Sequence, residues 1–67
     1  MTATINGEPR DLAEGQTLEM LLHSLGIDAA TGIAIAVNAR VVRRGAFADH
    51  TLRDGDAVEI IRAVAGG

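Results

Sequence analysis

Residues 17–26 read TLEMLLHSLG, and this short stretch determines how the rest of the chain must be arranged. Its four leucines recur at the i, i+3, i+4, i+7 spacing of one helix face: Leu18, Leu21, Leu22 and Leu25. Thr17 is a favourable N-cap, and Gly26 is placed to end the helix as its C′ residue. A helix of about nine residues is marginal alone in water. We therefore predict a helix over 17–25 whose leucine face packs on a sheet.

The segment before this helix predicts a β-hairpin. Residues 2–5 (TATI) are rich in β-branched side chains, and Asn6-Gly7 follows them directly. Asn-Gly favours a type I′ turn, which needs positive φ at both central residues. We predict strands over 2–5 and about 9–13. Pro9 has no N–H to donate to a ladder, so it belongs at the start of the second strand or on a sheet edge.

The segment directly after the helix predicts a strand with two unlike faces. Residues 33–37 read IAIAV, so large and small side chains alternate with period two. We assign the large side chains to the core: Ile33, Ile35 and Val37. Ala34 and Ala36 then form a flat, mildly apolar outer face.

The remainder of the chain predicts two more strands. A turn at 38–40 leads to a short strand at 41–43, and 44–53 is irregular, with Phe47 and Leu52 folding back to cap the core. Asp54-Gly55-Asp56 is a tight turn, and the last strand runs from 57 to 64. The order β-β-α-β-β-β predicts a two-layer α+β domain: a mixed sheet of four to five strands with one helix on one face. Its first and last strands can lie side by side in parallel.

Size and composition limit the function classes. The 67 residues make one domain, with a formal charge of −3, one aromatic residue (Phe47) and no cysteine. This balance argues against nucleic-acid binding, and two histidines without a thiol predict no metal site. The longest apolar run is too short to span a bilayer, and no secretory signal is visible. We expect a cytoplasmic protein that is a monomer when free and does not bind membranes.

No catalytic constellation is visible. Ser24 is the only serine, His50 lies in a polar loop, and no pattern in the sequence links the two. Arg40, Arg43 and Arg44 form a small basic cluster, which fits either a solvated surface or a docking patch for an acidic partner.

The end of the chain, Val64-Ala65-Gly66-Gly67, is the reactive feature. Neither terminal glycine is explained by a turn, and an unhindered Gly-Gly carboxylate can thread a narrow channel. Three extended residues reach about 10 Å, enough to enter another protein's active site. We therefore divide the chain into a domain (1–64) and a flexible tail (65–67). A carboxylate is a poor electrophile, so acyl chemistry at Gly67 requires activation, usually as an adenylate made from ATP.

A surface for the activating partner is predicted beside this tail. If Val58 and Ile60 face the helix, the next residues along the strand face outward beside the two alanines. This predicts a partner-docking face: Ala34, Ala36, Ile61 and Ala63. The alternative is that the 44–53 loop covers Ile61.

Together these motifs resemble the thiamine sulfur carrier (ThiS) family over the whole chain: Asn6-Gly7, Gly15-Gln16-Thr17-Leu18, residues 34–38, Asp54-Gly55-Asp56 and residues 64–67. The resemblance implies the ubiquitin-like β-grasp fold. It also implies that an E1-like adenylyltransferase activates Gly67 with ATP and magnesium, and that this chain binds neither. Sulfur from a cysteine-desulfurase route would then give a thiocarboxylate, the sulfur donor for thiazole synthase. Gly67 would carry the chemistry, with Gly66 and Ala65 as a slender tail, so the chain would be a co-substrate and not an enzyme.

Other readings stay open on sequence alone. The small subunit of molybdopterin synthase also ends in Gly-Gly, but its approach to the tail is typically more aromatic than residues 61–64 here. Carriers for cysteine or other sulfur metabolites would share the tail chemistry. A covalent protein modifier would join Gly67 to lysines on targets, and a non-covalent docking domain would not use the tail.

Overall fold

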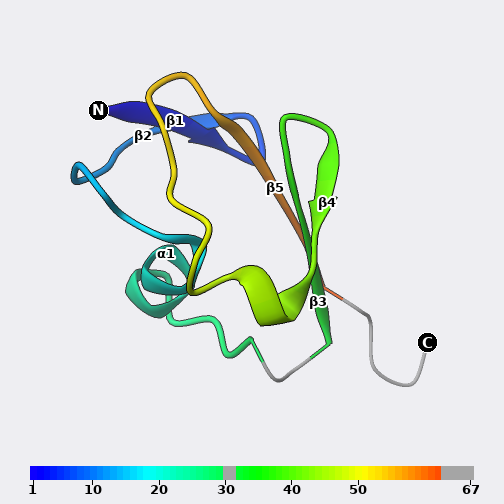
Figure 1. Cartoon of the computed structure of the whole chain (residues 1–67). Helices are drawn as coiled ribbons and strands as arrows, with labels where there is room; N and C mark the ends of the chain where they lie inside the picture. Colours follow the sequence, from blue (N-terminus) through cyan, green and yellow to red (C-terminus); the bar gives the residue numbers. More distant parts are fainter. Residues whose placement is uncertain (30–31, 63–67) are drawn as a thin grey trace.

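Five strands form one mixed sheet in the order β2-β1-β5-β3-β4. They are β1 (Thr2–Ile5), β2 (Glu8–Asp11), β3 (Ile33–Val37), β4 (Arg40–Val42) and β5 (Ala57–Arg62). Helix α1 (Leu18–Ser24) connects β2 to β3 and packs on one face of the sheet (Figure 1). The computed structural model describes residues 1–29 and 32–62. Within these residues, the predicted α+β class, the order of strands and helix along the chain and the single α-helix are confirmed.

Local sequence signals account for both ends of α1. The Thr17 hydroxyl oxygen accepts a hydrogen bond from the Met20 N–H at 3.2 Å, as an N-cap should. At the other end Gly26 has φ +71, and its N–H donates to the His23 carbonyl at 3.1 Å. The Ile27 N–H donates to the Leu22 carbonyl at 2.9 Å, which completes a Schellman motif. The predicted cap and C′ residue are both confirmed.

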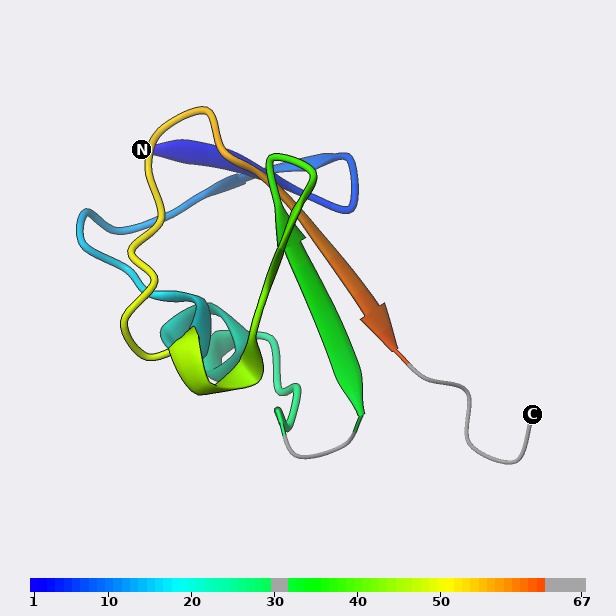
Figure 2. The same ribbon diagram turned by 45° about the vertical axis from the view of Figure 1, so that its right-hand side comes forward.

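β5 is the central strand of the sheet and lies between β1 and β3. It pairs in parallel with β1, where Ile5 lies opposite Val58, and antiparallel with β3, where Ile35 lies opposite Ile60. Figure 2 shows β3 and β5 running side by side, with α1 on one side of them. The predicted parallel neighbours, the first and last strands, are confirmed. Pro9 lies in β2, an edge strand, as its missing N–H requires.

Two strands, β2 and β4, have limits that differ from the sequence prediction, and turn length explains where each of them begins. Each hairpin turn has only two residues, so Ile5 pairs directly with Glu8 and Val37 with Arg40. Hence β2 begins at Glu8 instead of 9 and β4 at Arg40 instead of 41. At their other ends, β2 stops at Asp11 instead of 13 and β4 at Val42 instead of 43. β5 is described to Arg62; the predicted residues 63 and 64 lie outside the described residues.

The hydrophobic core lies between α1 and the sheet. Its buried members come from every layer of the fold: Ala3, Leu12, Leu18, Leu21, Leu22, Ile35, Val37, Phe47, Leu52, Val58 and Ile60. Phe47 and Leu52 cap this core, as predicted. Ile33, predicted as a core residue, is only half-buried because it begins β3 at the margin of the packed region, although it still contacts the core.

The segment after β4 returns to the helix. It contains the 3₁₀ helix η1 (Arg44–Ala46) and then crosses the start of α1. The Leu18 N–H donates to the His50 carbonyl at 3.0 Å and the Glu19 N–H to the Phe47 carbonyl at 3.1 Å. Two of the N–H groups that a helix leaves without internal partners are thereby satisfied. In the described part of the chain, no helix is long and apolar enough to cross a membrane.

Candidate functional site

The predicted reactive end of the chain continues from β5. Residues 63–67, and with them Ala63, Ala65, Gly66 and Gly67, lie outside the described residues. The division into a domain (1–64) and a tail (65–67) therefore stays a prediction. The structure describes the strand that leads to this end and the sheet face around it.

The bare face of the sheet brings three of the predicted docking residues together. Ala34 lies directly opposite Ile61 in the register of β3 and β5. Ala36 lies two residues further along β3, on the same face. The Ile61 side chain is 60% exposed. The predicted alternation of faces is confirmed, because Val58 and Ile60 are buried on the helix side.

The alternative prediction, that the 44–53 loop covers Ile61, is wrong. Residues 47–52 are hydrogen-bonded to the start of α1, including the Leu52 N–H to the Gln16 carbonyl at 2.8 Å. They therefore lie on the helix side of the sheet, whereas Ile61 faces the opposite side. Ile61 is left exposed next to Ala34.

Sequence reasoning missed one apolar residue on this face. Val41 lies opposite Ala36 in the register of β4 and β3, and its side chain is 78% exposed. The available signal was the pair Val41-Val42, because adjacent strand residues point to opposite faces. Since Val42 faces the core, Val41 must face outward. We call Ala34, Ala36, Val41 and Ile61 the outer patch.

Two asparagine side chains hold β5 from its two sides. The Asn6 Oδ1 accepts a hydrogen bond from the Ile60 N–H at 2.8 Å, and its Nδ2 donates to the Ile60 carbonyl at 3.3 Å. The Asn38 Oδ1 accepts from the Ala57 N–H at 2.9 Å. Both asparagines begin the two-residue turns described above, at φ 52. They fix the strand at its start and three residues further along.

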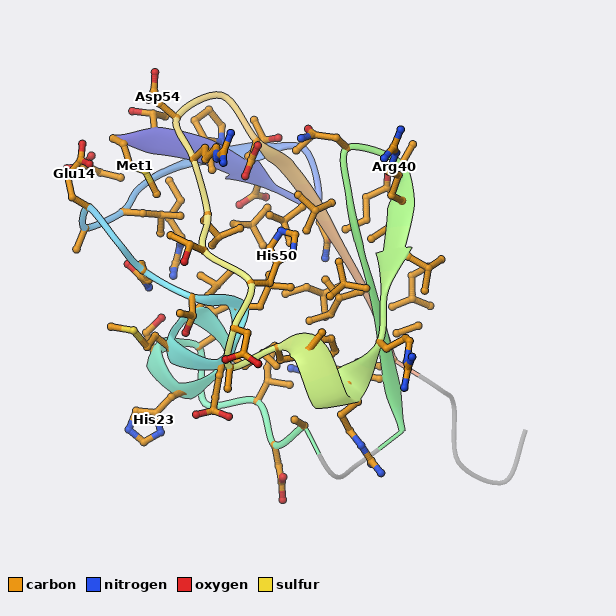
Figure 3. The ribbon with its side chains drawn as sticks, in the orientation of Figure 1. Met1, Glu14, His23, Arg40, His50 and Asp54 are labelled. Carbon is orange, nitrogen blue, oxygen red and sulfur yellow. The ribbon has the colours of Figure 1, made fainter. Side chains whose placement is uncertain are left out.

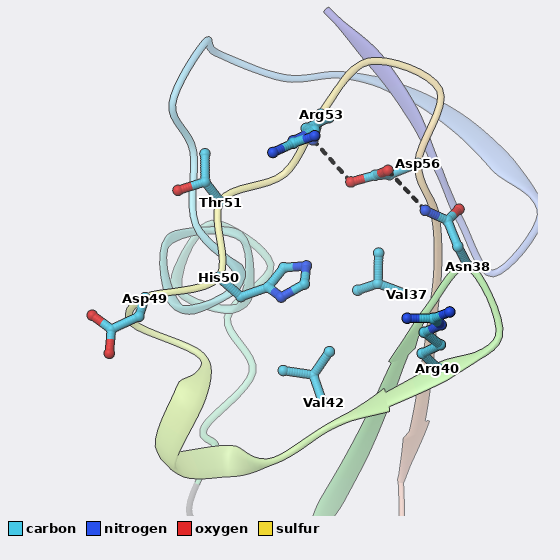
Figure 4. A pocket seen from close by; sticks show the side chains of 9 residues that line it. All are labelled: Val37, Asn38, Arg40, Val42, Asp49, His50, Thr51, Arg53 and Asp56. Atoms are coloured by element: carbon cyan, nitrogen blue, oxygen red, sulfur yellow. Dashed lines mark hydrogen bonds between the residues drawn. The ribbon is translucent and has the colours of Figure 1, made fainter.

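A groove of about 720 Å³ lies between the β3–β4 turn and residues 49–56 (Figure 4). Arg40, His50 and Arg53 contribute to its walls. Asp56 is held in place, because Oδ1 accepts from the Asn38 Nδ2 at 2.9 Å and Oδ2 from the Arg53 N–H at 2.9 Å. Gly55 has φ +86, which confirms that residues 54–56 form a turn. Both oxygens of Asp56 thus have structural hydrogen bonds.

The side chains from which a hydrolytic pair would be built have separate surroundings. The Ser24 hydroxyl donates to the Leu21 carbonyl at 2.7 Å within α1. His50 points from its loop towards the strands, whereas His23 points away from α1 (Figure 3). The structure therefore does not join Ser24 to either histidine.

The fold defines a class of protein. A mixed sheet in the order β2-β1-β5-β3-β4, with one helix on one face and the central strand leading to the chain's end, is the ubiquitin-like β-grasp fold. The crystal structure of the thiamine biosynthesis protein ThiS from Geobacter metallireducens has the same fold. It superimposes with a TM-score of 0.84 at 36% identity, over 100% of both chains.

Sequence comparison narrows the class to one family. The profile of the ThiS family matches residues 3–67. The sulfur carrier protein ThiS of Thermus thermophilus is 40% identical over 63 residues, which cover 94% of this chain and 95% of that protein. The chain belongs to the ThiS family.

A second kind of relative is much longer. A thiazole synthase of Paramagnetospirillum magneticum is 36% identical over 67 residues, which are 100% of this chain and 20% of that protein. The chain thus spans one fifth of the length of this relative. In that protein, a segment similar to this whole chain is part of a thiazole synthase.

Proposed function

We propose that this protein is a sulfur carrier for the thiazole ring of thiamine. Its Gly67 carboxylate is adenylated, converted to a thiocarboxylate, and then donates the sulfur to a thiazole synthase. The observation that carries this proposal is its similarity to a ThiS sulfur carrier protein over 94% of the chain. The thiazole synthase with a segment similar to the whole chain supports the same acceptor.

The chemistry divides between the chain and its partners. An E1-like adenylyltransferase supplies ATP and magnesium, and the Gly67 carboxylate displaces pyrophosphate to form the acyl-adenylate. A persulfide supplied by the cysteine-desulfurase route then displaces AMP to form an acyl disulfide, and a thiol cleaves its S–S bond to release the thiocarboxylate, the thiol ending in a disulfide. This chain binds no cofactor of its own and is a co-substrate, with Gly66 and Ala65 providing a tail narrow enough to enter the partner's site. We place these steps in the cytoplasm, with the free carrier as a monomer.

The outer patch is the surface that we propose for partner docking. An exposed isoleucine and an exposed valine surrounded by alanines present apolar area that loses little side-chain entropy when it is covered. Ile61 is the most important residue of the proposed docking surface, because it lies on β5 only six residues before Gly67 in the sequence. Ala63 would extend the patch towards the tail by the same alternation.

Removal of the last two residues tests the proposal directly. The protein without Gly66 and Gly67 is expected to fold like the full chain and to lose all sulfur transfer, since no acyl group of the right reach remains. Intact mass spectrometry after incubation with the activating enzyme, ATP and a sulfur donor measures the product. The full chain should gain the mass difference between sulfur and oxygen at Gly67.

Mass spectrometry, the truncation and an assay of thiazole formation together separate the other functions. A covalent modifier would appear as high-mass conjugates to target proteins instead of a thiocarboxylate. A docking domain would keep its pathway function after the truncation. A carrier for molybdopterin, cysteine or another metabolite would form the thiocarboxylate but fail to support thiazole formation with the thiazole synthase.

A further inference from the structure

The Asn6 side chain takes the place of a strand residue beside β5. β1 ends at Ile5, which lies opposite Val58, and the chain then turns into β2. The Asn6 N–H still donates to the Val58 carbonyl at 2.8 Å. Its side-chain amide then bonds both backbone groups of Ile60, at 2.8 Å to the N–H and 3.3 Å to the carbonyl. One side chain thus extends the β1 side of the ladder beyond the end of β1.

This anchor is the last one on the β1 side in the described chain. The next residues, Ile61 and Arg62, pair only with β3, opposite Ala34 and Ile33. Ile60 is buried in the core, whereas Ile61 is exposed in the outer patch. Asn6 therefore fixes the backbone at the residue where β5 changes from a strand bonded on two sides to one bonded on one side.

We propose that Asn6 is a positioning residue for the chemistry at Gly67. By holding Ile60, it fixes the backbone of β5 directly before Ile61 and Arg62, the last described residues on the way to Gly67. This inference rests on the proposed function, because the reaction at the chain's end is what makes that backbone position matter. A reacting group displaced by about 1 Å can lose on the order of a hundredfold in rate. Docking through the outer patch does not require Asn6, whose contacts lie within the sheet.

Asn38 provides a matched control within the same molecule. It begins the other two-residue turn, with the same φ of 52. Its N–H donates to the Ala57 carbonyl at 2.8 Å and its Oδ1 accepts from the Ala57 N–H at 2.9 Å. Asn38 therefore clamps β5 as Asn6 does, but at the first residue of the strand, three residues further from the chain's end than Ile60.

The experiment compares Asn6→Gly with Asn38→Gly in adenylation by the activating enzyme. Glycine keeps the positive φ of each turn, and its added freedom in the unfolded chain is common to both variants, so they differ in which side-chain amide is removed. For Asn6→Gly we expect kcat to fall about three- to tenfold while KM for the carrier stays within about twofold. For Asn38→Gly both constants should stay within about twofold at a similar loss of stability. Equal falls in kcat for the two variants, or no fall for either, would overturn the inference.

Amide hydrogen exchange measures the anchor without any partner. The Ile60 amide should exchange at least about tenfold faster in Asn6→Gly, after correction for global stability, but not in Asn38→Gly. Asn6→Asp keeps an acceptor for the Ile60 N–H and loses the donor, so its exchange rate at Ile60 should lie between those of the wild type and Asn6→Gly. This variant replaces Asn6→Gly in the experiment if the glycine variant does not fold. Unchanged exchange at Ile60 in either folded Asn6 variant contradicts the inference. If the wild-type chain is not adenylated, the proposed function is wrong, but hydrogen exchange still tests whether Asn6 anchors Ile60.

Discussion

The two faces of the sheet are built from alternate residues of the same strands, and they differ completely in what covers them. On the helix side, Ile35 and Val58 are each 1% exposed. On the other side, Ile61 is 60% and Val41 is 78% exposed. Neighbouring residues of one strand therefore serve different purposes: one set holds the domain together, and the next provides a surface. The difference predicts that substitutions on the two faces separate folding stability from the proposed partner docking.

The helix-side face should show the largest effect on stability. Ile35→Ala removes a buried side chain between α1 and the sheet, and loss of such a side chain typically costs about 2–5 kcal/mol. That is a large share of the stability of a domain of this size. Denaturant unfolding of the variant and the wild type measures the difference. Ile61→Ala is the matched substitution on the other face, and it should stay within about 0.5 kcal/mol of wild type.

Similar losses for both isoleucine variants would break the comparison. They would mean that Ile61 is covered in solution, for instance by a second copy of the chain. Size-exclusion chromatography of the wild type, where we expect a monomer, distinguishes that case from a change within the domain.

The outer face should show its effect in binding and not in folding. Ile61→Asp places a charge in the middle of the outer patch, opposite Ala34. Burying that charge against a partner is unfavourable, so we expect KM for adenylation to rise about tenfold or more, which is about 1.4 kcal/mol. The unfolding midpoint should change little, because the side chain is exposed in the free protein. Steady-state adenylation with the activating enzyme measures this prediction.

Met20 supplies the control for that prediction. The Met20 side chain is 53% exposed, a fraction similar to the 60% of Ile61, but it lies on α1, in the layer opposite the outer patch. Met20→Asp changes the net charge of the protein by the same amount as Ile61→Asp, but it should leave KM for adenylation unchanged. A KM for Ile61→Asp no higher than that of Met20→Asp in folded proteins would remove the outer patch as the docking surface.

Most of this fold could be predicted from sequence because its signals are local. The leucine spacing of α1, the Asn6-Gly7 turn and the alternation in β3 each need only a few adjacent residues. The outward direction of Ile61 also followed from alternation, once the helix side of β5 was assigned, but the structure was needed to show that the 44–53 loop leaves it exposed. What sequence could not supply is the partner of a polar side chain. The amide of Asn6 bonds Ile60, 54 residues away, and no periodic pattern marks that contact.

The second hairpin turn shows another limit. Asn38-Ala39 adopts positive φ at both residues, 52 and 67, as Asn6-Gly7 does at 52 and 86. Alanine is unfavourable at positive φ, so the pair does not signal a two-residue turn, and the predicted limits of β4 were therefore shifted by one residue, whereas those of β3 were correct. The side-chain and backbone bonds of Asn38 to Ala57 hold the turn in this conformation nonetheless.

The backbone strain at Ala39 predicts the smallest of these effects on stability, and relieving it should leave both faces of the sheet unchanged. Ala39→Gly removes a cost of about 1–2 kcal/mol for an L-residue at positive φ. The added freedom of glycine in the unfolded chain costs about 0.4–1 kcal/mol. We therefore expect a net stabilisation of about 0.5–1 kcal/mol by denaturant unfolding, with KM for adenylation unchanged. Gly7→Ala makes the opposite exchange at the same position of the other turn, where a Cβ would meet no atom within 4 Å. Any loss of stability in that variant must come from φ alone. If Ala39→Gly were neutral while Gly7→Ala was destabilising, the hydrogen bonds of Asn38, and not the backbone preference of residue 39, would determine the stability of the β3–β4 turn.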